Sequence, residues 1–211
     1  MQDPRRTNPE RTRTTRAALV GAARELFVEN GYASTSTPQI AAAAQVTRGA
    51  LYHHYTDKQD LFRAVVEAEA TAVADEIDRR TPPGSGTDPV QDLVLGARAY
   101  LAAMAVPGRT RLLLVDAPAV LGAAEADALD ARHARRTLRQ GLDAATSRTP
   151  HGGAPSSEAA SHDAARLDAL TLLLSAAFDR AALAVAEGSP PQPLGDAVTE
   201  LVERVCAPPA R

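Results

Sequence analysis

Apolar residues recur three and four positions apart along most of the chain, as in Leu19, Ala23 and Phe27 near its start and Leu170 and Leu174 near its end. Side chains at this spacing fall on one face of an α-helix. Aromatic residues, which favour strands, make up only 3% of the chain, whereas alanine, the best helix former, dominates its apolar share. The sequence therefore predicts an all-α protein.

Capping residues and helix breakers divide this pattern into segments. Hydroxyl and acidic caps mark helix starts, and Asn-Gly, Pro-Gly and Pro-Pro steps mark helix ends. Residues 146–161 are rich in small and turn-forming residues without periodicity, so a mobile loop is predicted there. The predicted segments are a flexible arm over 1–12 and helices over 14–30, 36–45, 48–54, 58–82, 88–106, 109–117, 123–145, 167–187 and 195–206.

Residues 36–58 have the spacing of a helix-turn-helix, because Thr47 caps a second short helix after a turn of three to four residues. A helix in the major groove needs polar or short side chains toward the bases and phosphate contacts at its ends. Arg48 is the expected base reader, and Gly49 allows close approach to the duplex. The predicted DNA contacts are Ser36, Thr37, Thr47, Arg48, Gly49, Tyr52, His53, His54 and Lys58.

Charge is unevenly distributed along the chain. Residues 1–58 hold eight basic and five acidic side chains, a net charge of +3, although the whole chain carries −3. A positive N-terminal segment suits a polyanionic partner. Whether Arg11, Arg13 or Arg16 reaches DNA or belongs to a solvated arm stays open at this point.

Three sequence blocks carry a resemblance to a known family. They are Glu-Leu-Phe-Val-Glu-Asn-Gly-Tyr at 25–32, Ile-Ala at 40–41 and Gly-Ala-Leu-Tyr-His-His-Tyr-Thr-Asp-Lys-Gln-Asp-Leu-Phe at 49–62. Over roughly residues 13–66 the chain resembles the TetR family of transcriptional regulators. The resemblance implies about nine helices: a three-helix DNA-binding domain over 13–57 and an antiparallel helical bundle over 58–207 for ligand sensing and dimerisation.

The resemblance also implies a homodimer, formed mainly by the helices over 167–187 and 195–206, that binds a palindromic operator in double-stranded DNA. Arg48, Gly49, Tyr52 and His53 become base or groove contacts by position. Ser36, Thr37, Tyr52, His54 and Lys58 become backbone contacts. Two departures stand out: Gln45 occupies a turn position where the family usually has glycine, which implies strain in a left-handed turn, and Pro38 replaces a residue that is often basic.

The C-terminal segments offer candidates for a ligand cavity. Five of the seven aromatic residues lie within the first 62 positions, so the cavity is expected to have mainly leucine, valine, alanine and methionine walls and to favour a small apolar or amphipathic effector. Several candidates are equally compatible with plain core or surface roles. The large or polar residues within apolar stretches are Tyr100, Met104, Arg111, Asp116, His133 and Phe178.

Other classes of function are disfavoured. Phosphate-binding loops, nucleophile elbows and zinc-type histidine pairs are missing from the sequence, so neither an enzyme nor a metal or other cofactor is expected. Neighbouring His53 and His54 point about 100° apart on a helix. With no signal peptide and no apolar run of about 18 residues, a cytoplasmic protein without a membrane partner is expected. A ligand-responsive repressor is the main hypothesis. The alternative is a DNA binder that is constitutive or controlled by a protein partner.

Overall fold

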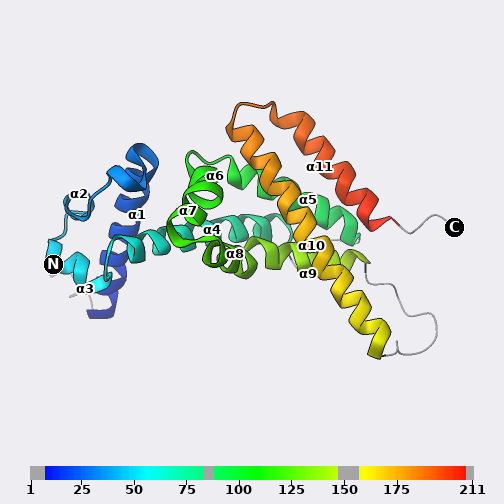
Figure 1. Ribbon diagram of the computed structural model, residues 1–211, viewed down its shortest axis with the longest axis horizontal. Helices are drawn as coiled ribbons and strands as arrows, with labels where there is room; N and C mark the ends of the chain where they lie inside the picture. Colours follow the sequence, from blue (N-terminus) through cyan, green and yellow to red (C-terminus); the bar gives the residue numbers. More distant parts are fainter. Residues whose placement is uncertain (1–7, 83–87, 147–156, 208–211) are drawn as a thin grey trace, which may run out of the picture.

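A computed structural model describes residues 8–82, 88–146 and 157–207 of the chain. These residues form helices and no strand, which confirms the all-α fold class (Figure 1). The helices are α1 (Asn8–Ser34), α2 (Thr37–Ala43), α3 (Arg48–His54), α4 (Lys58–Arg80), α5 (Pro89–Met104), α6 (Arg109–Arg111), the π-helical turn η1 (Leu112–Asp116), α7 (Ala117–Leu121), α8 (Ala123–Arg132), α9 (Ala134–Thr146), α10 (Ser157–Ala186) and α11 (Pro191–Cys206).

The helix starts around the helix-turn-helix are those the sequence predicts. Ser36 precedes α2, and its backbone amide donates to Gln39 Oε1 at 2.8 Å. Thr47 caps α3 by accepting from the amide of Ala50 at 3.1 Å, and Asp57 caps α4 by accepting from the amide of Asp60 at 2.7 Å. Each cap satisfies an amide that has no partner within its own helix.

The start of the first helix differs from the prediction. The helix begins at Asn8, so Thr14 lies inside it, and the Thr14 hydroxyl donates to the carbonyl of Glu10 at 2.9 Å instead of capping. Of the predicted arm over 1–12, residues 8–12 are therefore helical, and residues 1–7 lie outside the described part. Gly31 does interrupt the helix, with φ at 78°, before one more turn reaches Ser34.

Several predicted boundaries in the C-terminal part were also wrong. The predicted helix over 123–145 is split at His133, whose φ of −116° and ψ of −106° are not helical. The segment from Arg109 continues beyond Pro118 to Leu121, because a proline in the first turn of α7 leaves no amide donor unmet. These breaks produce more helical segments than the nine expected. The predicted loop over 146–161 is helical at Thr146 and from Ser157, and residues 147–156 lie outside the described part; α11 starts at Pro191.

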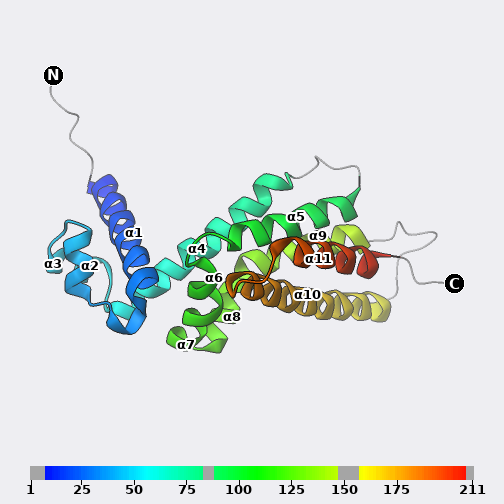
Figure 2. The same cartoon turned by 90° about the horizontal axis from the view of Figure 1, so that it is seen from above.

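Two hydrophobic cores lie along α4, which runs from the helix-turn-helix into the C-terminal bundle (Figure 2). Val65 and Val66 belong to the first core, together with residues of α1, α2, α3, η1 and α8. Val73 and Ile77 belong to the second, with residues of α5, α9, α10 and α11. Since one helix contributes to both cores, a shift of α4 affects both ends of the molecule.

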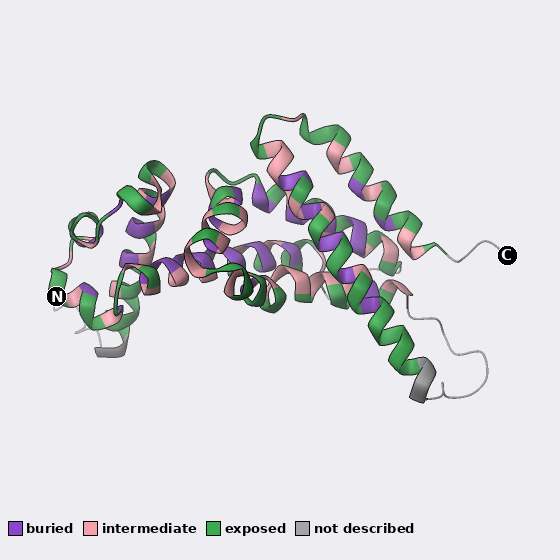
Figure 3. Ribbon diagram, viewed as in Figure 1, coloured by how far each residue is buried: buried purple, intermediate pink, exposed green. Residues whose placement is uncertain are grey.

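The last two helices, α10 and α11, form one outer layer of the bundle, and much of their outward surface is exposed (Figure 3). Residues 160–186 of α10 are long and apolar enough, by length and composition, to cross a membrane. About a third of the most apolar window, 33%, is buried within the bundle.

Candidate functional site

Helix α3 presents one polar face to solvent and one apolar face to the first core. Leu51 is fully buried, and Tyr55 is 3% exposed. The residues predicted to face DNA lie on the other side, where Arg48, Gly49 and His53 are exposed and Tyr52 is 47% exposed. The structure therefore brings the predicted base and groove contacts together on one accessible surface.

Tyr52 joins the two helices of the motif. Its Oη lies 3.0 Å from Thr37 Oγ1, at the start of α2. The hydrogen bond with Thr37, followed by the interaction with Arg48, lowers the pKa of Tyr52. This contact fixes the position of α3 against α2 and places three predicted DNA contacts side by side.

The turn between α2 and α3 shows the strain that its sequence implies. Gln45 adopts φ of 56°, the only non-glycine residue with positive φ in the described ranges 8–82, 88–146 and 157–207. Its neighbours still form a closed turn, because the amide of Val46 donates to the carbonyl of Ala41 at 2.9 Å. The motif thus keeps its geometry without glycine, at a conformational cost.

Lys58 has protein partners in this structure. Its Nζ donates to the carbonyls of Tyr32 at 2.9 Å and Thr35 at 3.0 Å, and lies 4.2 Å from the centre of the Tyr32 ring. A cation at the end of α1 satisfies carbonyls that the helix leaves without partners. This explains a lysine in the first turn of α4, a position that the helix dipole disfavours.

The two histidines and the N-terminal arginines occupy separate positions. The rings of His53 and His54 are 5.2 Å apart, and no described group of three histidine, cysteine, aspartate or glutamate residues is arranged to hold a metal ion. Burial, His53 and Arg16 lower the pKa of His54. The Arg16 guanidinium lies 5.3 Å from the centre of the Tyr55 ring, Arg13 is exposed on α1, and the side chain of Arg11 lies outside those described.

An ion-pair network of Glu69, Arg24 and Arg109 forms the joint between the N-terminal helices and the C-terminal bundle. Glu69 of α4 is 7% exposed and pairs with Arg24 of α1 at 2.8 Å and with Arg109 of α6 at 2.9 Å. Burial alone would raise the pKa of Glu69, but the hydrogen bonds from the two arginines lower it. Arg24 also donates to the carbonyl of Pro107 and Arg109 to that of Ala103, so three helices meet at one carboxylate.

Arg111 and Asp116, predicted as ligand contacts, lie at this same joint and do not line the cavity enclosed by α4, α5, α9 and α10. They form an ion pair at 3.1 Å, and Arg111 Nη2 donates to the carbonyl of Phe27 in α1 at 2.8 Å. Gly108, with φ of 80°, packs so closely here that a Cβ atom would lie 2.4 Å from Val28 Cγ2. Residues 108–111, directly before η1, are therefore packed closely against α1.

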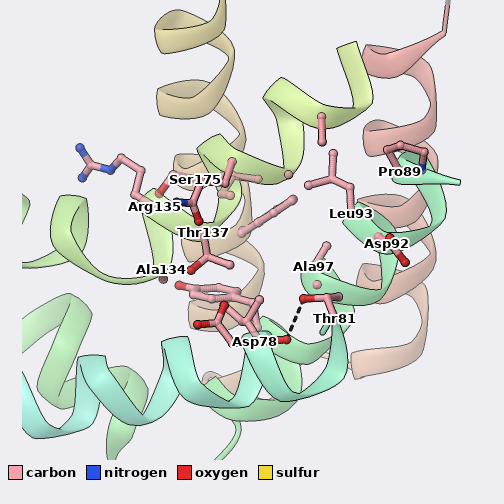
Figure 4. A pocket seen from close by; sticks show the side chains of 18 of the residues that line it. Asp78, Thr81, Pro89, Asp92, Leu93, Ala97, Ala134, Arg135, Thr137 and Ser175 are labelled. Atoms are coloured by element: carbon pink, nitrogen blue, oxygen red, sulfur yellow. Dashed lines mark hydrogen bonds between the residues drawn. The ribbon is translucent and has the colours of Figure 1, made fainter. Parts of the chain in front are cut away.

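A cavity of about 400 Å³ opens between α4, α5, α9 and α10 (Figure 4). Of the predicted ligand residues, Tyr100 and Phe178 line it. Met104 and His133 line a second cavity of about 40 Å³, which Tyr100 also borders. The lining of the larger cavity is Ile77, Asp78, Thr81, Pro82, Pro89, Asp92, Leu93, Gly96, Ala97, Tyr100, Ala134, Arg135, Thr137, Leu138, Gln140, Gly141, Ala144, Ser175 and Phe178.

A polar cluster behind the Tyr100 ring was not predicted. Tyr100 Oη donates to Asp179 Oδ1 at 2.5 Å, and Asp130 pairs with Arg135 at 2.8 Å. Burial, together with the nearby Asp130, raises the pKa of Asp179 to about 6. Helix periodicity gave no signal for this cluster. Asp179 follows the core residue Phe178 in the sequence, where a surface position is expected, and only the packing of α5 brings Tyr100 against it.

Comparison with known proteins covers both parts of the chain. A family model described as bacterial regulatory proteins, tetR family, matches residues 19–65, and one described as tetracyclin repressor-like, C-terminal domain, matches residues 90–208. The chain is 39% identical over 70 residues to the HTH-type transcriptional regulator AcrR of Shigella flexneri and 42% identical over 62 residues to the HTH-type transcriptional repressor BepR of Brucella suis. These matches cover 33% and 29% of the chain and the same shares, 33% and 29%, of the two relatives.

The whole fold has counterparts among solved structures. A TetR-family transcriptional regulator from Pectobacterium atrosepticum superposes with a TM-score of 0.65 at 29% identity, over 95% of either chain. The sequence similarity to the curated relatives is thus confined to about a third of their length, whereas the structural similarity extends over both parts.

Proposed function

This chain belongs to the TetR family of bacterial regulatory proteins, and we propose that it is a repressor that a small apolar or amphipathic molecule releases from a palindromic operator. The observation that carries the proposal is the exposed face of α3. Arg48, Gly49, Tyr52 and His53 stand on it together, within a segment of net positive charge. Regulators of this family bind DNA and are not enzymes.

The exposed face of α10 and α11 supports a homodimer. Leu172 is 54% exposed, Leu173 is 68% exposed and Leu201 is 38% exposed, although each is a large apolar side chain. Apolar surface of this kind is normally covered by a partner. A second copy of the chain, seated on these two helices, would place two α3 helices against two half-sites of a palindrome.

The cavity and the joint together could couple ligand binding to DNA binding. Helix α5 lines the cavity through Leu93, Ala97 and Tyr100. In the segment after it, Arg109 pairs with Glu69 of α4, and Arg111 donates to the carbonyl of Phe27 in α1. A ligand can bind more tightly to a conformation with displaced α4 and α5 than to the conformation that binds the operator. The difference between these two binding free energies sets how far the ligand lowers the affinity for the operator. An open cavity favours this hypothesis over the alternative without a small-molecule ligand, for which a filled interior is expected.

The test is anisotropy binding of the purified protein to labelled duplexes selected from its own upstream DNA, with a scrambled duplex as reference. Arg48→Ala is expected to weaken binding to the selected duplex by about 1–3 kcal/mol and to leave scrambled DNA nearly unaffected. Arg139→Ala, which removes an exposed arginine of α9, is the matched control. If the protein fails to distinguish any duplex from a random pool, DNA-sequence recognition is ruled out.

A further inference from the structure

The charged side chains that line the cavity of about 400 Å³ are two carboxylates and one guanidinium. Three charged side chains line it: Asp78 of α4, Asp92 of α5 and Arg135 of α9 (Figure 4). Most of the remaining lining is apolar, with the rings of Tyr100 and Phe178 on one side. The sign of the charge that a ligand can carry therefore depends on which of these three groups is free to interact with it.

Arg135 is already neutralised. Its Nε donates to Asp130 Oδ2 at 2.8 Å and its Nη2 donates to Asp127 Oδ1 at 2.6 Å. In Figure 4 the guanidinium points away from the labelled side chains of α4 and α5, so that mainly its aliphatic stem is on the cavity side. A guanidinium held by two carboxylates offers little attraction to an anionic ligand.

The two lining carboxylates have no such partner. Neither Asp78 nor Asp92 forms an ion pair within residues 8–82, 88–146 and 157–207, and both keep contact with solvent. A third carboxylate, Asp179, lies outside the lining and accepts from the Tyr100 hydroxyl, the one hydrogen-bond donor to it among the described residues. An anion entering the cavity would meet repulsion from all three, whereas a cation would gain from each.

We propose that the larger cavity binds a lipophilic monocation, a compact apolar or aromatic body with one ammonium-type charge. The apolar body packs between Leu93, Leu138 and the rings of Tyr100 and Phe178, and the charge lies toward Asp78 and Asp92. This inference assigns a ligand class to the effector site of the proposed function, and it rests on that function only where it says that the ligand regulates DNA binding. Ligand binding itself does not require DNA.

The experiment is isothermal titration of the full-length protein, without DNA, with three matched probes: naphthylmethylamine as cation, naphthylmethanol as neutral compound and naphthoate as anion. The cation is expected to bind about tenfold more tightly than the neutral probe, a difference of about 1.4 kcal/mol, and the anion more weakly than either. The preference should shrink at high salt, because the two carboxylates are partly solvated.

Two variants test whether Asp78 and Asp92 attract the positive charge of the ligand. Asp78→Asn together with Asp92→Asn should bring the affinities for cation and neutral probe to within about twofold. Asp75→Asn, an exposed acid of α4 outside the cavity lining, should keep the tenfold preference. Equal or tighter binding of the anion overturns the proposal, as does a cation preference that survives the double substitution or a failure of all three probes to bind.

Operator release is measured separately, by adding each probe to the protein–DNA complex. Cation binding without release would retain the assigned ligand class and overturn the regulatory proposal. Release by the anion alone would overturn the ligand class and retain the regulator.

Discussion

The two hydrophobic cores differ in how completely they are filled. In the first core, the rings of Phe27, Tyr32 and Phe62 lie 5.0 to 5.6 Å apart, and Phe27 and Phe62 are fully buried. In the second core, Tyr100 and Phe178 lie 6.1 Å apart beside an open cavity of about 400 Å³. A close-packed core holds one arrangement, whereas a cavity leaves its lining without contacts on one side.

The buried polar groups differ in the same way. At the joint with the first core, Glu69 has two arginine partners and a lowered pKa. Beside the cavity, Asp179 has one neutral donor and a raised pKa. The end with the helix-turn-helix is thus held in one geometry, whereas the other end retains a carboxylate without a cationic hydrogen-bond partner and an open cavity.

The largest expected difference in stability comes from replacing one phenylalanine by alanine in each of the two cores. Phe62→Ala should lower the free energy of unfolding by about 3–5 kcal/mol, because its ring has neighbours on all sides. Phe178→Ala should cost about 2 kcal/mol less, since its ring already lines a cavity and has fewer contacts to lose. Urea unfolding monitored by circular dichroism measures both, and equal losses would contradict the contrast between the cores.

A second prediction concerns Asp179, the half-buried acid near the cavity. The pKa of Asp179 rises from 3.8 in the unfolded chain to about 6 in the folded one, so between these values the folded state binds more protons and stability falls as pH rises. Asp179→Asn keeps an acceptor for Tyr100 and should remove this fall, which amounts to about 3 kcal/mol at most.

Unfolding free energies from pH 4 to pH 7 provide the measurement for Asp179→Asn, with Asp163→Asn, an exposed acid of α10, as control. A variant whose stability declines with pH as steeply as that of the natural protein would show that Asp179 ionises without penalty.

The third prediction tests the joint between the two ends. Glu69→Gln should destabilise the protein by about 1–3 kcal/mol at pH 7, because it weakens two buried charged hydrogen bonds. Since the folded pKa of Glu69 is lowered, the stability that its carboxylate contributes is present above the unfolded pKa and is lost as pH falls through the folded one. The variant and the natural protein should therefore converge in acid.

Glu67→Gln on the same helix is the matched control for Glu69→Gln, because Glu67 is 42% exposed at its side chain and pairs with the exposed Arg132 and the half-buried His133, neither of which lies in α1. Hydrogen exchange should show faster opening of α1 in Glu69→Gln and not in Glu67→Gln. Unchanged exchange in α1 would mean that the network does not hold the two ends together.

The smallest expected effect concerns the turn of the helix-turn-helix. Gln45→Gly should stabilise the protein by about 0.5–1 kcal/mol, because glycine adopts positive φ without the clash that a Cβ atom causes. Gln45→Ala keeps the Cβ atom and should bring no gain. Thermal unfolding of the two variants distinguishes relief of backbone strain from loss of the glutamine side chain, and a gain in both would reject the strain.

Local sequence signals predicted the helix-turn-helix. Ser36, Thr47 and Asp57 mark helix starts through hydrogen bonds that span three residues, and the strained turn at Gln45 follows from the missing glycine. Such contacts depend on neighbours in the chain, so they are visible in the sequence. Arg48 and its neighbours lie on the exposed face as predicted, whereas their contacts with DNA stay a prediction.

The sequence by itself determined the all-α class, the helix-turn-helix and the positive charge of its segment, because helix periodicity, caps and composition are local properties. Only the tertiary structure decided that Arg111 and Asp116 lie at the joint, that Lys58 donates to carbonyls at the end of α1, and that the half-buried Asp130 and Asp179 lie near Tyr100. The hydrogen bonds of Lys58 with Tyr32 and Thr35, of Tyr100 with Asp179 and of Arg111 with Phe27 join residues 23 to 84 positions apart along the chain. No local pattern encodes which charged side chain such packing will bury.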